Sequence, residues 1–231
     1  PNVGEAFAVV PLGDLDKAGF DSSVRAIVDY FKSIGEKPVF KKVPEAFIDK
    51  FKEFTDDNSI IYDRDNSDYI YCTQDLVKLK GSQYSSKRNH INRFMRDFRY
   101  EYIELANDNI DKCKVIMKEW CERRECNCTR GDYCERYANA ELLDNYKTLG
   151  CKGALLKVNG QYRAFTTGEM LSDDIAVIHI EKASFEIPGL YALINREFCT
   201  REWKNTKYIN REQDLGHEGL RKAKLSYNPV R

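Results

Sequence analysis

The sequence contains no long hydrophobic run. A helix that crosses a bilayer needs about 20 consecutive apolar residues, and no stretch of this 231-residue chain comes close to that length. The sequence also shows no signal-peptide pattern, in which a basic start precedes an apolar core. These absences exclude a membrane-spanning segment from this sequence. We expect a cytoplasmic protein whose only contact with a membrane would be peripheral.

An excess of charge of one sign is missing as well. The 37 basic and 37 acidic residues give a net charge of zero, which argues against a dedicated nucleic-acid-binding protein. The charges are unevenly spread, however, because residues 78–99 contain seven Lys or Arg and one Asp, whereas residues 45–68 contain eight acids and three bases. The basic segment is either a binding surface for an anionic ligand or the solvated face of a helix.

Several catalytic motifs are absent. The chain has no phosphate-binding loop of the form G-x-x-x-x-G-K-[ST] and no G-x-G-x-x-G fingerprint, which excludes the common nucleotide-hydrolysing and dehydrogenase classes. Its three histidines, His90, His179 and His217, do not have the spacing of metal ligands. No Ser-His-Asp or Cys-His set is recognisable, and we expect no metal in the site.

Eight cysteines are present, and four of them form a cluster. Without a secretory pattern we expect reduced thiols in a cytoplasm. The cluster has four, one and five intervening residues, a spacing that matches no standard zinc knuckle, and no histidine lies near it. An exposed loop is therefore expected. The alternative to an exposed loop is a zinc site whose ligands are Cys121, Cys126, Cys128 and Cys134.

Hydrophobic periodicity predicts the order β-α-β-α-β-β for residues 1–72. Asp21 is expected to cap the first helix and Gly35 to end it, and Pro44 suits the start of the second helix. An apolar run begins almost directly after Pro1, so we expect upstream sequence to be missing. The predicted strands are residues 5–12, 38–43, 59–62 and 69–72, and the second helix covers residues 45–54.

Residues 73–231 show a longer alternation of the two patterns. A helical stretch starts at Thr73 and breaks at Gly81, and Ser85-Ser86 is expected to cap the helix that follows. Further helices are predicted after Asn107 or Asp108, near residues 138–147, and at residues 190–198 and 218–223. The predicted strands are residues 100–105, 153–158, 161–167, 175–180, 208–210 and 225–227.

The strongest local signal is the pair Asn159-Gly160. It suits a type I′ hairpin, because both central residues of that turn need positive φ, and it joins the first two strands of a three-strand meander. The third strand is apolar but ends in titratable residues, among them His179 and Glu181. Since side chains alternate along a strand, these two are expected to share a face, where one orients the other as a general base. The meander therefore predicts the wall of an active site.

The order β-β-β-loop-α-β-α-β resembles that of GNAT acyltransferases, in which the loop after the third strand meets the cofactor phosphates. We expect an α+β fold of this kind, with a mixed sheet flanked by helices. The first part ends in a similar order, so two tandem copies are expected: residues 1–72 as an incomplete first copy and residues 73–231 as the active second copy. The loop KASFEIPGL has one glycine, Gly189, and lacks the glycine-rich phosphate pattern, which disfavours acetyl-CoA.

Longer motifs resemble the C-terminal domain of bacterial phosphatidylglycerol lysyltransferases and its soluble relatives. They are KGSQYSSKRNHINRF, the strands around AFTTGE, HIEKA, and GLRKAKLSYNP. The runs KRN-x-x-N-R and GLR-x-x-K-x-x-Y-x-P together make the match specific. The resemblance implies a tandem GNAT fold and transfer of an amino acid from aminoacyl-tRNA. Membrane-bound members transfer it to a lipid glycerol hydroxyl, but this sequence lacks a membrane segment, so the acceptor stays unknown.

Aminoacyl transfer needs a positive cradle for the tRNA end, an anion for the substrate α-amine, and a proton relay for the nucleophile. The catalytic candidates are His179, Glu181 and Glu169, with Tyr227 as a general acid. Lys87 is expected in the first turn of a helix, where a cation opposes the helix dipole, and such local conflicts are typical of functional positions. The substrate-binding candidates are Lys87, Arg88, Asn89, Arg93, Lys182, Gly189, Asn195, Asn210, Arg211, Glu212, Arg221 and Lys224.

Each candidate also has an ordinary alternative, namely a solvated helix face, an internal ion pair or a tyrosine at the edge of the core. Three functions therefore stay open. The first is an aminoacyltransferase with aminoacyl-tRNA as donor and tRNA as partner. The second is an N- or O-acyltransferase with an acyl-CoA as donor, and the third is a non-catalytic binding module on the same fold.

Overall fold

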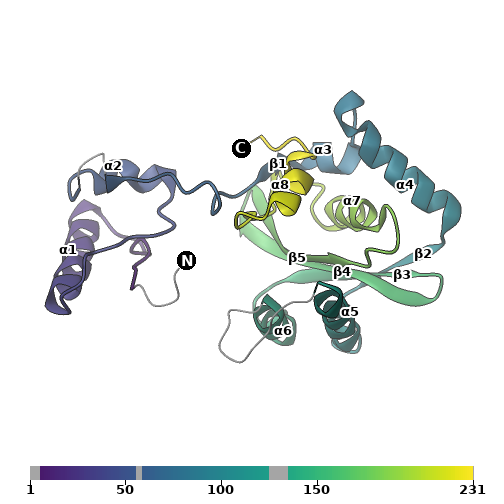
Figure 1. Cartoon of the computed structure of the whole chain (residues 1–231), viewed down its shortest axis with the longest axis horizontal. Helices are drawn as coiled ribbons and strands as arrows, with labels where there is room; N and C mark the ends of the chain where they lie inside the picture. The colour runs from purple at the N-terminus through teal and green to yellow at the C-terminus, as the bar shows by residue number, and fades with distance from the viewer. Residues whose placement is uncertain (1–5, 56–58, 125–134, 231) are drawn as a thin grey trace. The chain divides into compact units, whose positions relative to one another are not determined.

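The computed structural model describes residues 6–55, 59–124 and 135–230. Its contacts divide the chain into two compact units, Pro1–Asn66 and Ser67–Arg231 (Figure 1). The sequence placed a boundary between Cys72 and Thr73. Strand β1 (Ile70–Cys72), which lies just before that position, pairs with a strand of the second unit. The duplication of one fold along the chain stays a prediction.

The first unit contains α1 (Lys17–Ser33), the short helix η1 (Glu45–Phe47) and α2 (Ile48–Phe51). The Asp16 carboxylate caps α1 by accepting a hydrogen bond of 2.8 Å from the backbone N–H of Gly19. The prediction that Asp21 caps this helix was therefore wrong, because the helix begins more than a turn earlier. Gly35 has a φ of 76° directly after the C-cap residue, as expected for a helix end.

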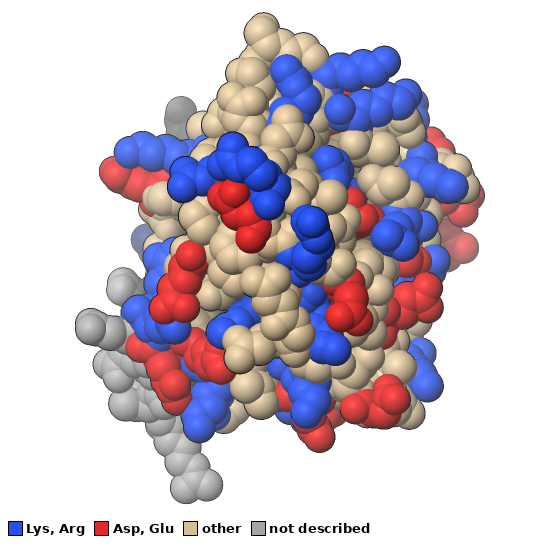
Figure 2. All heavy atoms as spheres, turned by 90° about the vertical axis from the view of Figure 1, so that its right-hand side faces the viewer, with Lys and Arg blue, Asp and Glu red and all other residues tan. Residues whose placement is uncertain are grey.

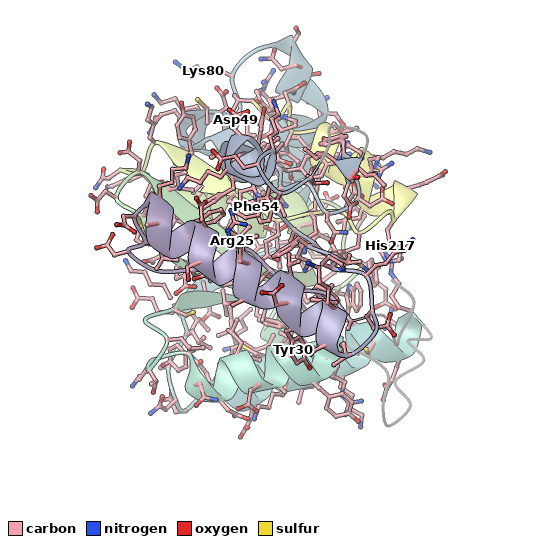
Figure 3. All side chains as sticks on the ribbon, turned by 90° about the vertical axis from the view of Figure 1, so that its left-hand side faces the viewer. Arg25, Tyr30, Asp49, Phe54, Lys80 and His217 are labelled. Carbon is pink, nitrogen blue, oxygen red and sulfur yellow. The ribbon has the colours of Figure 1, made fainter. Side chains whose placement is uncertain are left out.

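The core of the first unit is small. Its one cluster contains four buried residues, Val10, Phe20, Val24 and Phe51, with partly buried side chains around them, and Phe31 of α1 is buried as well. Among the described residues of this unit, the predicted strands reduce to one isolated parallel bridge between Ala8 and Phe40, and none forms at 59–62. At the edge of this core the Arg25 guanidinium lies 5.3 Å from the centroid of the Phe54 ring (Figure 3).

The second unit contains a mixed six-stranded sheet in the order β1-β6-β5-β4-β3-β2. Strands β5 and β6 are parallel, and every other neighbouring pair is antiparallel. The turn residues Asn159 and Gly160 have φ values of 47° and 83°, which confirms the predicted hairpin. The remaining strands are β2 (Tyr100–Glu104), β3 (Lys152–Val158), β4 (Gln161–Ser172), β5 (Ile175–Ala183) and β6 (Tyr208–Asn210).

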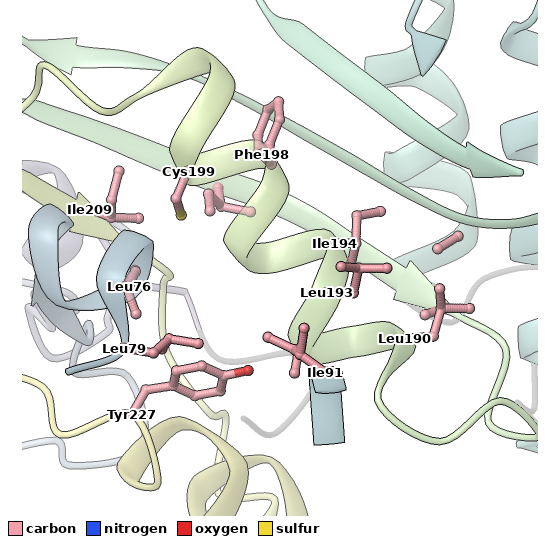
Figure 4. Close-up of a cluster of buried hydrophobic side chains, with 14 of the residues drawn as sticks. Leu76, Leu79, Ile91, Leu190, Leu193, Ile194, Phe198, Cys199, Ile209 and Tyr227 are labelled. Carbon is pink, nitrogen blue, oxygen red and sulfur yellow. The ribbon is translucent and has the colours of Figure 1, made fainter. Parts of the chain in front are cut away.

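Helices cover both faces of this sheet (Figure 1), as the sequence predicted. One face packs against α5 (Ile110–Arg123) and α6 (Glu135–Asn145), and the other packs against α7 (Leu190–Glu202). Around α7 lie α3 (Thr73–Lys78), the short helix η3 (Ser82–Tyr84), α4 (Ser85–Asp97) and α8 (Glu218–Leu225). Side chains of α7 such as Leu193 and Phe198 meet Ile91, Ile209 and Tyr227 in the larger core cluster (Figure 4).

Two local predictions in this unit were wrong. Ser85 is the first residue of α4 and makes no capping hydrogen bond, since the N-cap position is Tyr84. The predicted strand at residues 225–227 does not form, because α8 continues to Leu225. Tyr227 is instead buried, with its ring edge-on to Tyr71 at a centroid distance of 6.4 Å.

Candidate active site

The sheet opens between its two parallel strands. The ladder between β5 and β6 has three residue pairs and ends at Val177 and Asn210. β5 continues to Ala183 with β4 on its other side. After β6 the chain turns away through Glu212, whose φ is 56°. A non-glycine residue in this region carries strain of about 1 kcal/mol or more, and such strain is concentrated at functional sites. We call the place where β5 and β6 diverge the β5–β6 split.

A β-bulge decides which way the side chains of β5 point. Thr167 pairs with Ile180 and Gly168 pairs with Ile178, so His179 is an extra residue on β5. As a result Ile178 belongs to the core cluster against α7, and Ile180 to the cluster against α5 and α6. The prediction that strand alternation places His179 and Glu181 on one face was therefore wrong, because the bulge shifts the alternation by one residue.

His179 is held between two carboxylates. Its Nδ1 lies 2.8 Å from Glu212 Oε1 and its Nε2 lies 3.0 Å from Glu169 Oε1. The hydrogen bond with Glu212 raises the pKa of His179 above its ordinary value, burial opposes this, and Glu169 reinforces it. The Sγ of Cys151 lies beside this pair, and burial raises the pKa of its thiol.

Glu181 lies on the α7 side of the sheet in a second polar group. Its carboxylate accepts hydrogen bonds of 2.9 Å from Arg211 Nη2 and 2.9 Å from Asn195 Nδ2 of α7. The Glu181 and Arg211 side chains are only 12% and 13% exposed. Burial is the largest single influence and opposes the charge of the guanidinium, but Glu181 together with Tyr227, Tyr71 and Cys199 keeps the pKa of Arg211 above its ordinary value.

This buried group has unused hydrogen-bonding capacity. Among the described residues, Arg211 Nη1 and Asn195 Oδ1 are buried without a hydrogen-bond partner. An unpaired buried polar atom costs about 1–3 kcal/mol of stability. A ligand that supplies the missing hydrogen-bond partner would recover this free energy on binding. One atom is a hydrogen-bond donor and the other an acceptor.

Lys87 and Arg211 place positive charge over the Tyr227 ring, and Lys224 bonds the turn after β6. Lys87 Nζ, in the first turn of α4, lies 4.1 Å from the centroid of the Tyr227 ring, and Arg211 lies 4.8 Å from it. Burial and then the Arg211 charge lower the pKa of Lys87. Lys224 donates to the carbonyl oxygens of Arg211 and Glu212, the latter at 3.1 Å. It therefore stabilises the strained turn after β6.

A further ion pair supports the same turn. Asp214 is fully buried and accepts hydrogen bonds of 2.5 Å from the Tyr69 hydroxyl and 2.8 Å from both Nε and Nη2 of Arg221. The hydrogen bonds from Arg221 hold the pKa of Asp214 well below its usual range. Asn210 accepts a hydrogen bond of 2.7 Å from the Glu212 N–H and donates one of 2.7 Å to Asp68.

Other predicted site residues lie elsewhere. Arg88 donates to the Leu79 carbonyl and, at 2.7 Å, to the Gly81 carbonyl, so it stabilises the connection between α3 and α4. Arg93 is exposed and lies 3.6 Å from Asp97, and Asn89 is also exposed on the same helix. Figure 2 shows basic side chains spread over the face of the molecule that looks to the right in Figure 1, with acidic side chains among them.

Lys182 and Gly189 have structural contacts of their own. Lys182 Nζ bonds Glu135 at 2.8 and 2.9 Å and lies 3.8 Å from the centroid of a Trp120 ring. A Cβ at Gly189 would lie 2.4 Å from the His90 carbonyl oxygen, so α7 and α4 approach closely there. The functional roles predicted for these residues stay predictions.

The structure brings residues to the split that the sequence did not single out. Cys151 is one of the four cysteines outside the cluster, and its only signal in the sequence is its position at the start of a predicted strand, directly after Gly150. Asp214 belongs to the polar run that follows β6, which is a weak signal. Of the clustered cysteines, Cys121 is buried in α5, and Cys126, Cys128 and Cys134 lie outside the described residues, so a zinc site there stays a prediction.

The three-strand meander, the bulge, the helix that follows and the splayed parallel pair define an α+β fold of the GNAT-like class. Residues 4–231 match the family described as phosphatidylglycerol lysyltransferase, C-terminal, and the chain belongs to this family. This confirms the resemblance noted in the sequence motifs. Among the residues that the structure describes, no helix has both the length and the apolar character that a membrane crossing requires.

Solved structures agree with this assignment. A conserved protein of unknown function from Bacteroides thetaiotaomicron VPI-5482 is 37% identical over 96% of this chain and 75% of its own, with a TM-score of 0.86. L-PGS from Bacillus licheniformis is 16% identical over 96% of this chain and 73% of its own, with a TM-score of 0.64. FemX shares the fold at 9% identity, 96% and 77% coverage, and a TM-score of 0.58. No curated protein matches.

Proposed function

We propose that this protein transfers an aminoacyl group from aminoacyl-tRNA, in the cytoplasm, to an acceptor hydroxyl or amine. The observation that carries the proposal is a buried polar group at the β5–β6 split of a chain that belongs to the phosphatidylglycerol lysyltransferase C-terminal family. That group offers a charged pair, Glu181 and Arg211, and two unpaired polar atoms. A purely structural ion pair has no need of the unpaired atoms, since each one costs stability.

In this proposal the aminoacyl group enters from the α7 side of the sheet. Its α-ammonium is held by Glu181 and by the unpaired Asn195 Oδ1. Attack by the acceptor on the ester carbonyl places negative charge on the carbonyl oxygen, and Arg211 Nη1 is the donor that faces this charge. Removal of one such donor typically lowers the rate by a factor of about 100 to 1,000.

The proton of the acceptor passes to a carboxylate at the split, and the bond to the ribose oxygen of the tRNA breaks. Glu212 suits the first step, because its side chain is 37% exposed and His179 fixes its orientation. Tyr227 suits protonation of the leaving oxygen. Its hydroxyl carries a proton at neutral pH, as tyrosine ordinarily does, and burial raises the pKa of that hydroxyl further.

The test uses the full chain with tRNAs that carry labelled amino acids, and follows both loss of the ester and transfer of the label. Phosphatidylglycerol vesicles and small amines serve as acceptors, and acetyl-CoA replaces the tRNA in a parallel series. We expect tRNA-dependent transfer that falls about 100-fold in Glu181→Gln. Glu197→Gln is the matched control, because Glu197 is also 12% exposed and paired with arginines on α7.

Three results would contradict the proposal. Acetyl transfer without tRNA dependence would identify the protein as a CoA-dependent acyltransferase. Binding of either donor without any turnover would identify a binding module. Equal loss of activity in Glu181→Gln and Glu197→Gln would show that Glu181 acts only through the stability of the fold.

A further inference from the structure

Three adjacent strands bring a sulfur, an oxygen and a nitrogen together beside the split. Cys151 directly precedes β3, Glu169 lies on β4, and His179 is the bulged residue of β5. The Sγ, a carboxylate oxygen and a ring nitrogen of these residues all lie within 4.8 Å of one another. No pair of them is close in sequence, so the arrangement arises only from the pairing of the strands.

The bulge and a second carboxylate fix the orientation of the histidine. A Cβ at Gly168 would lie 2.3 Å from the Val177 carbonyl oxygen, so the two backbones can approach this closely only with glycine. On the far side of the ring, Nδ1 bonds Glu212 at 2.8 Å. Metal-binding histidines typically donate their other ring N–H to a carboxylate in this way.

The ligand types and distances suit a tetrahedral metal ion. Zinc binds cysteine sulfur, histidine nitrogen and carboxylate oxygen at about 2.0–2.3 Å, which puts the ligand atoms roughly 3–4 Å apart. His179 Nε2 and Glu169 Oε1 are already 3.0 Å apart. The mixed set of sulfur, nitrogen and oxygen disfavours magnesium and calcium, which take oxygen ligands.

We propose that Cys151, Glu169 and His179 bind a zinc ion, with Glu212 as the residue that orients the histidine. The Glu169 and His179 side chains are 34% and 23% exposed, so a water molecule can occupy the fourth position from the solvent side. The ion would link β3, β4 and β5 at the edge of the split. This proposal does not depend on aminoacyl transfer, because it concerns binding alone.

The test is titration of the metal-free full chain with Co²⁺, which replaces Zn²⁺ and absorbs light characteristically when a thiolate binds it. Cys126, Cys128 and Cys134 are first replaced by serine, so that Cys121, which is buried in α5, is the one thiol of the cluster that remains. We expect one Co²⁺ per chain, a thiolate-to-cobalt absorption band, and loss of the band on addition of Zn²⁺. Cys151→Ser should abolish the band, and Glu212→Gln should weaken binding 10- to 100-fold.

Cys72→Ser is the matched control, since Cys72 is a half-buried thiol on β1 that lies outside the three-residue group. It should leave the band and the stoichiometry unchanged, and circular dichroism should show every variant folded. The proposal is overturned if the folded protein binds no Co²⁺, or if the band survives Cys151→Ser. Equal binding by Glu212→Gln and the parent would overturn the orienting role of Glu212.

Discussion

At the scale of single residues, the site is defined by groups that are costly to bury. A buried ion pair such as that of Glu181 and Arg211 contributes little net stability, because desolvation of both charges offsets their attraction. Loss of one partner is nevertheless expensive, since the other is left buried and charged. Net stability therefore does not explain why the Glu181–Arg211 pair is present. The coupling energy of the pair can be measured by unfolding, without an activity assay.

Arg211→Met is expected to lower the free energy of unfolding by about 3 kcal/mol, because it leaves the Glu181 carboxylate buried without its guanidinium. The double variant Arg211→Met/Glu181→Leu should recover most of this loss, because no unpaired charge remains. Urea unfolding of the wild type, both single variants and the double variant measures the coupling. Additive losses in the double variant would contradict this account.

Lys224 gives the site a pH dependence. Burial lowers the pKa of its ammonium to about 8, Arg211 acts in the same direction, and the carboxylates of Glu212, Glu181 and Asp68 oppose it. Between pH 8 and about 10.4, the ordinary lysine pKa, the unfolded chain binds more protons at this position than the folded chain. The free energy of unfolding therefore rises with pH across that window. Below the window Lys224 is charged in the folded protein, and the full destabilisation from burying its ammonium is present.

The measurement compares the wild type with Lys224→Met by urea unfolding at pH 7.5 and pH 9.5. The free energy of unfolding of the wild type, minus that of Lys224→Met, should be about 2 kcal/mol larger at pH 9.5 than at pH 7.5. Lys204→Met is the control, because Lys204 is exposed, and its difference should stay constant. A constant difference for Lys224→Met would show that this lysine has an ordinary pKa in the folded protein.

At the scale of helices and strands, the sequence predicted elements well where the signal is local. The meander β3-β4-β5 follows from Asn159-Gly160 and from alternating apolar residues. The bulge at His179 could not be predicted, because it depends on the close approach of Gly168 to β5 and leaves no local pattern. Strands β1 and β6 have three residues each and pair across more than 130 residues, so their partnership was also invisible.

The packing of α7 against α4 is the element contact that a single substitution tests most directly. Gly189→Ala should lower the free energy of unfolding by about 3 kcal/mol, because the residue has a φ of 87° and a Cβ would lie 2.4 Å from the His90 oxygen. Gly160→Ala also has positive φ, at 83°, but nothing lies within 4 Å of its Cβ, so it should cost only about 1 kcal/mol. If urea unfolding shows that both variants lose the same free energy of unfolding, backbone strain alone accounts for both losses and the contact with His90 contributes nothing.

At the scale of the whole molecule, the two units differ in how much core they have. The second unit has two clusters of buried side chains, one on each face of its sheet, and the first unit has one cluster of four buried residues. A unit of this small size rarely gains more than about 3–5 kcal/mol from a single core. The expected duplication of one fold is not visible in the pattern of cores, so it stays a prediction.

Phe20→Ala is therefore expected to unfold the first unit at 25 °C, because removal of a buried phenylalanine costs about 3–5 kcal/mol. Hydrogen exchange with mass spectrometry should show loss of protection in peptides from α1, while peptides from β3, β4 and β5 keep theirs. Phe94→Ala, in the core against α7, is the reciprocal variant and should weaken protection in the second unit only. If protection in β4 falls with that of α1 in Phe20→Ala, the two units fold as one.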